Sequence, residues 1–270
     1  MPSTTVNGID LYYEMRPSPG AQRVLFISGS GGDLRQKPSV LDGPLSVGFE
    51  LLGYDQRGIG QTDIPDGPYT MADYGDDAAG LVDAVGWDRC AVVGVSFGGM
   101  VAMHLAVRRP ALVERLVLCC ASSGGAGGSS YPLHTLGDLP PDERAARGLE
   151  ISDTRLDAAW REAHPKEFDQ MSKVYASRAA VDRDEPQRAL GQRLQLEARK
   201  DHDVHDRLGE LRMPVLCCAG RYDGIAPPEN MEAVAAQIPG ARVEMFEGGH
   251  MFLAQDHTAF PKIVDFLRDN

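Results

Sequence analysis

A serine in the segment Gly94–Gly98 has the surroundings of a catalytic nucleophile. The segment reads Gly-Val-Ser-Phe-Gly, an apolar run precedes it, and a helical pattern follows it. In the pattern G-x-S-x-G, a sharp turn between a strand and a helix exposes the serine hydroxyl. The same turn places the N–H of Phe97 at a helix N-terminus, where it faces developing negative charge. We therefore predict that Ser96 attacks a carbonyl carbon and that the Phe97 N–H donates to the resulting oxyanion.

A serine is a weak nucleophile near neutral pH, so it needs a base, and the base needs an orienting carboxylate. Asp223 follows one apolar run downstream, in Gly-Arg-Tyr-Asp-Gly, and His250 follows the next, in Gly-Gly-His-Met. The order serine, acid, histidine is the order that accompanies G-x-S-x-G. We predict that His250 takes and returns the proton, while Asp223 holds the imidazole and stabilises its charge.

The elements that must position these residues alternate between strands and helices along most of the chain. This alternation predicts an α/β fold, in which helices cover both faces of a mostly parallel, twisted sheet. Each of the three candidates follows a strand, so all three belong to the carboxyl edge of the sheet, where open α/β sheets bind ligands. The expected strands are Thr4–Val6, Ile9–Met15, Val24–Ile27, Phe49–Tyr54, Ala91–Val95, Leu116–Cys120, Val215–Ala219 and Arg242–Phe246, and the expected helices are Met71–Val85, Met100–Val107 and Phe260–Arg268.

The alternation stops after the sixth strand. Ser122–Ser130 consists of serine, glycine and one alanine, which predicts a flexible tether without packing of its own, and the following segment is helical and charged. We predict a core of residues 1–121 and 210–270, with residues 122–209 inserted as a mobile helical cap. Trp160, Arg161 and Arg178 are candidate substrate-binding residues of this cap, since guanidinium groups bind carboxylates well. The alternatives are solvent-facing helix surfaces for the arginines and a packing contact with the core for Trp160.

With these residues in place, the chain resembles the α/β-hydrolase family over essentially its whole length. The segments GVSFGGM, RYDGIAP and GGHMF carry the resemblance, and DQRGIG (55–60) with GPYT (67–70) is most similar to 3-oxoadipate enol-lactonases and related small carboxylesterases. The resemblance implies a serine hydrolase that cleaves a small carboxylic ester or lactone through an acyl-enzyme, with no metal and no organic cofactor. Cleavage of a C–C bond in vinylogous diketones is the alternative chemistry on this fold.

One position departs from the family pattern. Many relatives have His-Gly after the third strand, whereas this chain has Ser28 and Gly29. The resemblance then implies that the second oxyanion donor is the backbone N–H of Ser30 or that of Gly29.

Composition narrows the partners of the protein. The 270 residues carry a formal charge of −12, which disfavours nucleic acids and anionic membranes as partners and leaves a small-molecule substrate. No signal peptide and no apolar run of membrane-spanning length is apparent. The five cysteines lie in apolar runs, which indicates buried free thiols and a cytoplasmic location. The sequence leaves assembly into a homo-oligomer open.

Three competing interpretations remain. The segment Gly29–Leu34 begins like a dinucleotide-binding loop, with Asp55 at the distance of a ribose-binding acid, but its last glycine is missing. The run Asp201–Asp206 alternates aspartate and histidine like a metal site, although a solvated surface is the simpler interpretation. A binding module without catalysis on the same fold is the third.

Overall fold

A computed structural model gives the fold and describes residues 2–178, 185 and 187–269. One sheet of eight strands runs through this part of the chain in the order β1-β2-β4-β3-β5-β6-β7-β8. The strands β1 and β2 are antiparallel to their neighbours, and all other pairs are parallel. Their bounds are β1 (Ser3–Val6), β2 (Ile9–Arg16), β3 (Arg23–Ile27), β4 (Glu50–Tyr54), β5 (Cys90–Val95), β6 (Val113–Cys119), β7 (Val215–Gly220) and β8 (Arg242–Phe246).

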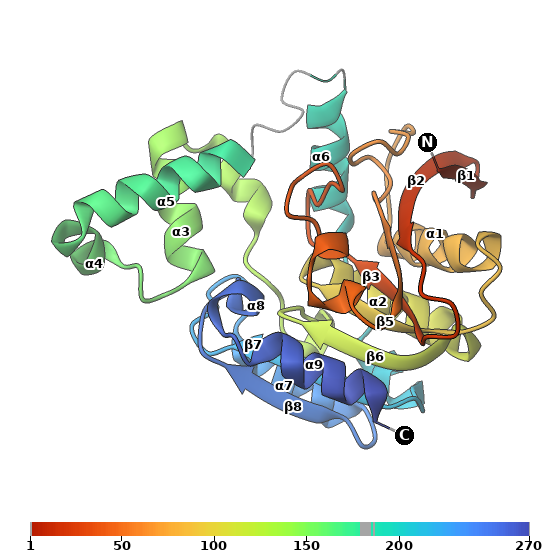
Figure 1. The fold of residues 1–270 in the computed structure, drawn as a ribbon. Coiled ribbons are helices and arrows are strands. Elements are labelled where there is room, and N and C mark those ends of the chain that lie inside the picture. The colour runs from red at the N-terminus through yellow and green to blue at the C-terminus, as the bar shows by residue number, and fades with distance from the viewer. Residues whose placement is uncertain (1, 179–184, 186, 270) are drawn as a thin grey trace.

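Helices cover both faces of the sheet, which confirms the predicted fold class (Figure 1). Buried side chains of α1, α2 and α7 pack on one face, and those of α8 and α9 pack on the other. In the described part of the chain no helix is both long and apolar enough to cross a membrane. The bounds are α1 (Met71–Ala84), α2 (Phe97–Arg108), α7 (Pro228–Gln237), α8 (Phe252–Gln255) and α9 (Ala259–Arg268).

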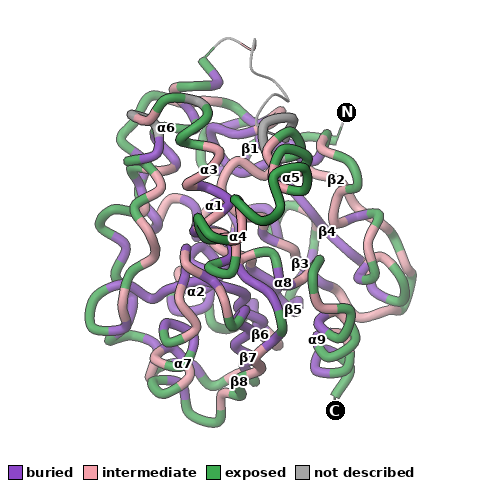
Figure 2. Tube along the Cα trace, turned by 90° about the vertical axis from the view of Figure 1, so that its left-hand side faces the viewer, coloured by how far each residue is buried: buried purple, intermediate pink, exposed green. Residues whose placement is uncertain are grey.

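The segment between β6 and β7 is helical, and its described residues form no strand of the sheet. Its helices α3, α4 and α5 form an arm that projects beyond the sheet, whereas α6 lies against the core (Figure 1). In Figure 2 most of α4 and α5 is exposed, and α4 has no buried residue. The bounds are α3 (Pro141–Ser152), α4 (Ala158–Ala163), α5 (Pro165–Arg178) and α6 (Arg188–Ala198).

The prediction that Ser122–Ser130 has no packing of its own is wrong for the first residues of the segment. Ser123 is completely buried, and its carbonyl oxygen accepts a 2.9 Å hydrogen bond from the N–H of Val204. Gly124 forms a β-bridge with Asp203, and a Cβ added at Gly124 would lie 1.8 Å from the His202 carbonyl oxygen. Glycine is therefore needed here for close backbone contact, and the composition that suggested a tether belongs to a tight packing joint.

All five cysteines are free and buried, as predicted. They lie in or directly after β5, β6 and β7, at the centre of the sheet, so their thiols pack as small apolar groups.

Candidate active site

Ser96 lies in the turn between β5 and α2, and its backbone is held in an unusual conformation. Its φ of 55° lies in the left-handed region, which non-glycine residues seldom adopt. The glycines at both ends of the motif are required sterically: a Cβ at Gly94 would lie 2.4 Å from the Gly98 carbonyl oxygen, and one at Gly98 would lie 2.1 Å from that of Ile27. The turn thus stores strain that the surrounding packing maintains, as is common at functional sites.

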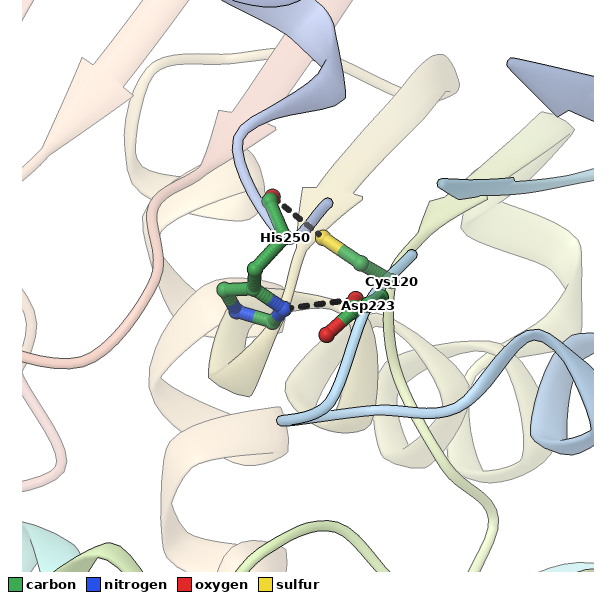
Figure 3. A group of neighbouring side chains, drawn as sticks. All are labelled: Cys120, Asp223 and His250. Carbon is green, nitrogen blue, oxygen red and sulfur yellow. Dashed lines mark hydrogen bonds and ion pairs between the residues drawn. The ribbon is translucent and has the colours of Figure 1, made fainter. Parts of the chain in front are cut away.

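The structure brings the three sequence-predicted residues into one hydrogen-bonded chain. His250 Nε2 lies 2.9 Å from Ser96 Oγ, and His250 Nδ1 lies 2.7 Å from Asp223 Oδ2, the pair drawn in Figure 3. The other carboxylate oxygen of Asp223 accepts the N–H groups of Ile225 and Ala226 at 2.8 and 2.9 Å. The carboxylate is thereby fixed against the imidazole. In the neutral histidine this favours a proton on Nδ1 and leaves Nε2 to accept from the serine hydroxyl.

Burial by itself lowers the pKa of the His250 imidazole, but the interactions with Cys120 and with the hydrogen-bonded carboxylate of Asp223 outweigh it and raise that pKa above its usual range. A raised pKa means that the site stabilises the imidazolium form. This is the form that appears when the histidine takes the serine proton. The site therefore favours the charged form of His250 over the neutral form.

Cys120 is a neighbour of this pair that the sequence analysis did not single out. Its Sγ lies 3.6 Å from the carbonyl oxygen of His250 (Figure 3), and burial raises the pKa of the thiol. The ligand atoms of Cys120, Asp223 and His250 lie within 4.8 Å of one another, so these are side chains that could hold a metal ion, at the expense of the Asp223–His250 hydrogen bond. Its position directly after β6, beside the strands that lead to Ser96 and Asp223, was the available sequence signal.

Two segments can supply oxyanion donors beside Ser96. Phe97 is the first residue of α2, so its N–H has no acceptor within the helix. Gly29 lies against the serine, since a Cβ added to it would lie 3.5 Å from Ser96 Cβ. In the loop 29–32, the N–H groups of the last two residues are bonded to Gln195 Oε1 and to the Gly29 carbonyl, respectively. Those of Gly29 and Ser30 have no acceptor among the described residues.

The C-terminal end of α3 is bonded to both catalytic loops, a contact that sequence reasoning missed. The carbonyl oxygen of Ser152 accepts the N–H of His250 at 2.6 Å, and that of Ile151 accepts the N–H of Gly224 at 2.9 Å. A Cβ at Gly249 would lie 2.0 Å from the Ser152 oxygen, so the approach depends on glycine. Backbone atoms make these contacts, and they leave little trace in residue types.

The candidate substrate-binding residues of the insertion are placed as follows. Trp160, on α4, is half-buried and stacks on His164 with ring centroids 4.8 Å apart. Arg161 lies over the ring of Phe168, 5.7 Å from its centroid. These are contacts within α4 and α5. Arg178 ends α5, and its side chain lies outside what the structure describes.

The dinucleotide interpretation does not agree with the structure. Asp55 is fully buried, and its carboxylate accepts the N–H groups of Leu34 and Gln61 at 2.8 and 2.9 Å. The loop after β3 leads to a short 3₁₀ turn at Val40–Asp42, without the α-helix whose N-terminus would bind a pyrophosphate. Asp55 thus acts as a structural acceptor for two loops.

The run Asp201–Asp206 does not converge on one point. His202 Nε2 lies 2.8 Å from the Ser122 carbonyl oxygen, and His205 Nδ1 lies 2.9 Å from Ser123 Oγ. One ring nitrogen of each histidine therefore bonds to the segment that follows β6, His202 to Ser122 and His205 to Ser123.

Comparison with known proteins agrees with this geometry. Residues 22–256 match the family described as the alpha/beta hydrolase fold. A relative from Variovorax paradoxus, whose name describes it as carbamate hydrolase RutD, is 26% identical over 274 residues, covering 95% of this chain and 96% of its own. A poly(3-hydroxyalkanoate) depolymerase from Ectopseudomonas oleovorans is 24% identical, with 94% and 87% covered. The crystal structure of the enol-lactonase from Burkholderia xenovorans has a TM-score of 0.78 and 27% identity, with 99% and 100% covered.

Proposed function

Because the chain belongs to the α/β-hydrolase fold family, we propose that it is a serine hydrolase that cleaves a small carboxylic ester or lactone through an acyl-enzyme. The observation that carries this proposal is the unbroken chain of hydrogen bonds from Ser96 through His250 to Asp223, at 2.9 and 2.7 Å. Likeness to an enol-lactonase over the whole chain supports the ester or lactone as substrate class.

In the proposed reaction Ser96 Oγ attacks the substrate carbonyl while His250 Nε2 removes its proton. Asp223 holds the imidazole and stabilises the imidazolium. The backbone N–H of Phe97, together with that of Ser30 or Gly29, stabilises the oxyanion. His250 then protonates the leaving alcohol, and a water molecule, activated by the same histidine, releases the acid.

We further propose that residues 122–209 act as a cap over a core of residues 1–121 and 210–270. The bonds from Ile151 and Ser152 to the catalytic loops, and the contact of α6 with the loop after β3, support this division. Substrate contacts by Trp160, Arg161 and Arg178 remain predictions of the sequence analysis.

A carbamate is a second candidate substrate, because the Variovorax paradoxus relative is named as a carbamate hydrolase. The same attack of a serine on a carbonyl carbon would serve it. A carbamate carries nitrogen on the carbonyl carbon where a carboxylic ester carries carbon, so a panel of matched substrates distinguishes the two.

The test has two parts. A fluorophosphonate probe is expected to label Ser96 stoichiometrically, and Ser96→Ala is expected to abolish labelling and to lower kcat by a factor on the order of 10⁴ or more. A panel of matched esters, lactones, carbamates and vinylogous diketones then ranks the substrate classes by kcat/KM. Full turnover of a preferred substrate by folded Ser96→Ala would overturn the nucleophile, and a preference for the diketones would replace ester cleavage by C–C cleavage.

We also propose the compartment in which the protein works. Five unpaired, buried thiols support a reducing compartment, the cytoplasm, as the place where the protein works. The substrate is a small molecule.

A further inference from the structure

The loop that borders Ser96 is held by a side chain from the insertion. Gln195, on α6, is 1% exposed, and its Oε1 accepts the N–H of Gly31 at 2.8 Å. Two residues earlier in that loop, Gly29 lies against Ser96. One glutamine of α6 thus reaches the loop that offers the second oxyanion donor.

The orientation of this amide follows from the partner. A backbone N–H can only donate, so the atom of Gln195 that faces Gly31 must be the carbonyl oxygen, and the NH₂ group points elsewhere. This Nε2 is buried and has no hydrogen-bond partner among the described residues. Ser30 Oγ, on the residue directly before Gly31, is also buried and likewise has no partner there.

Two such atoms, one on the loop beside Ser96 and one on the side chain that binds this loop, need an explanation. Buried polar side-chain atoms nearly always have a partner, because an unpaired donor in the interior loses its hydration without compensation. Gln195 could have been a leucine if anchoring α6 by packing were its only role, since its neighbour Leu194 packs in the same core. The amide NH₂ group and the hydroxyl group can each donate a hydrogen bond to an acceptor atom.

We propose that Gln195 Nε2 and Ser30 Oγ form a polar subsite that binds a second oxygen atom of the substrate. This rests on the proposed ester or lactone hydrolysis. Since the glutamine NH₂ only donates, the group bound must be an acceptor, which makes the substrate class an ester or lactone that carries an additional keto, ether or hydroxyl oxygen. A site built to hydrogen-bond such an oxygen discriminates against the analogue without it, because its own polar atoms then stay unpaired.

The experiment compares substrates that differ only in this oxygen. On the acyl side the pair is p-nitrophenyl 4-oxopentanoate and p-nitrophenyl 4-methylpentanoate, and on the alcohol side it is 2-methoxyethyl acetate and butyl acetate. Within each pair the number of heavy atoms is the same. The wild-type protein is expected to prefer the oxygen-bearing member of at least one pair by about 5- to 50-fold in kcat/KM.

The variants separate substrate binding from anchoring of the loop. Ser30→Ala removes the hydroxyl but keeps the backbone N–H, and Gln195→Met keeps the length of the side chain without its polar atoms. Both are expected to reduce the preference at least about 3-fold. Gln192→Met, on the exposed face of the same helix, is the matched control and should leave the preference unchanged.

A role in anchoring alone would give a different result. Gln195→Met would then lower kcat/KM for both members of a pair by the same factor, and the preference would stay as in the wild type. Equal rates for both members of both pairs in wild-type protein would also overturn the subsite. Fluorophosphonate labelling of the same preparations keeps the conclusions apart: loss of labelling contradicts the serine mechanism, whereas normal labelling without any preference contradicts the subsite alone.

Discussion

The turn at Ser96 and the outer helices of the arm, α4 and α5, differ in what surrounds their side chains. Around Ser96, Phe97 is 1% exposed and the glycines leave no room for a Cβ, so the surrounding core fixes the backbone. In the arm, α4 has no buried residue, Trp160 stacks on His164 directly after α4, and Arg161 lies over Phe168 of α5. We therefore expect a substitution near Ser96 to disturb the backbone of the turn, whereas α4 and α5 offer few packed contacts that a substitution could break.

Two segments of the insertion are fixed by packing in the same way as the turn at Ser96. The glycine segment after β6 is packed against the chain around His202, and the end of α3 bonds to the loops of Asp223 and His250. The exposed part of the insertion therefore consists of α4 and α5, which lie between α3 and the packed helix α6.

The largest difference in kcat is expected when the same type of substitution, aspartate to asparagine, is made once in each region. Asp223→Asn removes the charge that orients His250, and we expect kcat to fall by a factor on the order of 10³ to 10⁴, since the histidine is then held in the wrong tautomer. Asp157→Asn, at the N-cap of α4 where the carboxylate accepts the N–H of Trp160, keeps a good cap and should change kcat less than about 2-fold. Steady-state kinetics on one activated ester measures both, and similar losses would contradict the contrast.

The glycine segment offers the next largest effect. Gly124 has a φ of +73°, and an added Cβ would meet the His202 carbonyl oxygen, so Gly124→Ala should lower the free energy of unfolding by about 2 to 4 kcal/mol. In a protein of this size the corresponding fall in Tm is roughly 5 to 15 °C, measured by calorimetry. Gly209→Ala is the control, because its Cβ would meet only one atom, at 3.7 Å. Equal Tm values for the two variants would restore the idea of a loose tether.

The same joint should make stability depend on pH. His104 Nε2 lies 3.2 Å from His202 Nδ1, and burial lowers the pKa of each to about 4. Between pH 6.5 and 4 the unfolded chain binds protons that the folded protein does not, so stability is lost as the pH falls through this window, by about 1 to 2 kcal/mol per pH unit. The charged groups nearest to the pair are Asp76, Arg108, Arg199, Asp203 and Arg207.

Urea unfolding at pH 7 and pH 5 measures this loss. His104→Gln should reduce the difference between the two pH values, whereas His257→Gln, at an exposed position, should leave it as in the wild type. If both variants show the same difference in unfolding free energy between pH 7 and pH 5 as the wild type, the pair of His104 and His202 does not cause the pH dependence.

The smallest effect is expected in the arm. Trp160→Ala removes a half-buried ring that stacks on His164, so the free energy of unfolding should fall by less than about 1 kcal/mol. Turnover of a small activated ester should stay within about 2-fold, while kcat/KM for a bulky ester changes about 2- to 5-fold if the arm contacts substrate. Unchanged rates for both esters would remove Trp160 from the substrate-binding residues.

The sequence determined the elements and the reacting groups of this protein. Strand and helix periodicity and the G-x-S-x-G turn are local signals, because each depends on residues close together in the chain. The order of Ser96, Asp223 and His250 is likewise a property of the sequence alone. The turn at Asn7 and Gly8, with φ of 48° and 78°, is also a local feature, because Asn-Gly favours a two-residue hairpin turn.

Only the tertiary structure decided which neighbours complete the site. Glycine and serine occur in flexible linkers and in tight joints alike, so composition could not place Gly124 against His202. The bond from the Ser152 carbonyl to His250 uses backbone atoms that every residue has, and Gln195 meets Gly31 across 164 positions of sequence. Such contacts depend on how separate elements pack, and a reading of periodicity and motifs along the chain carries no information about that packing.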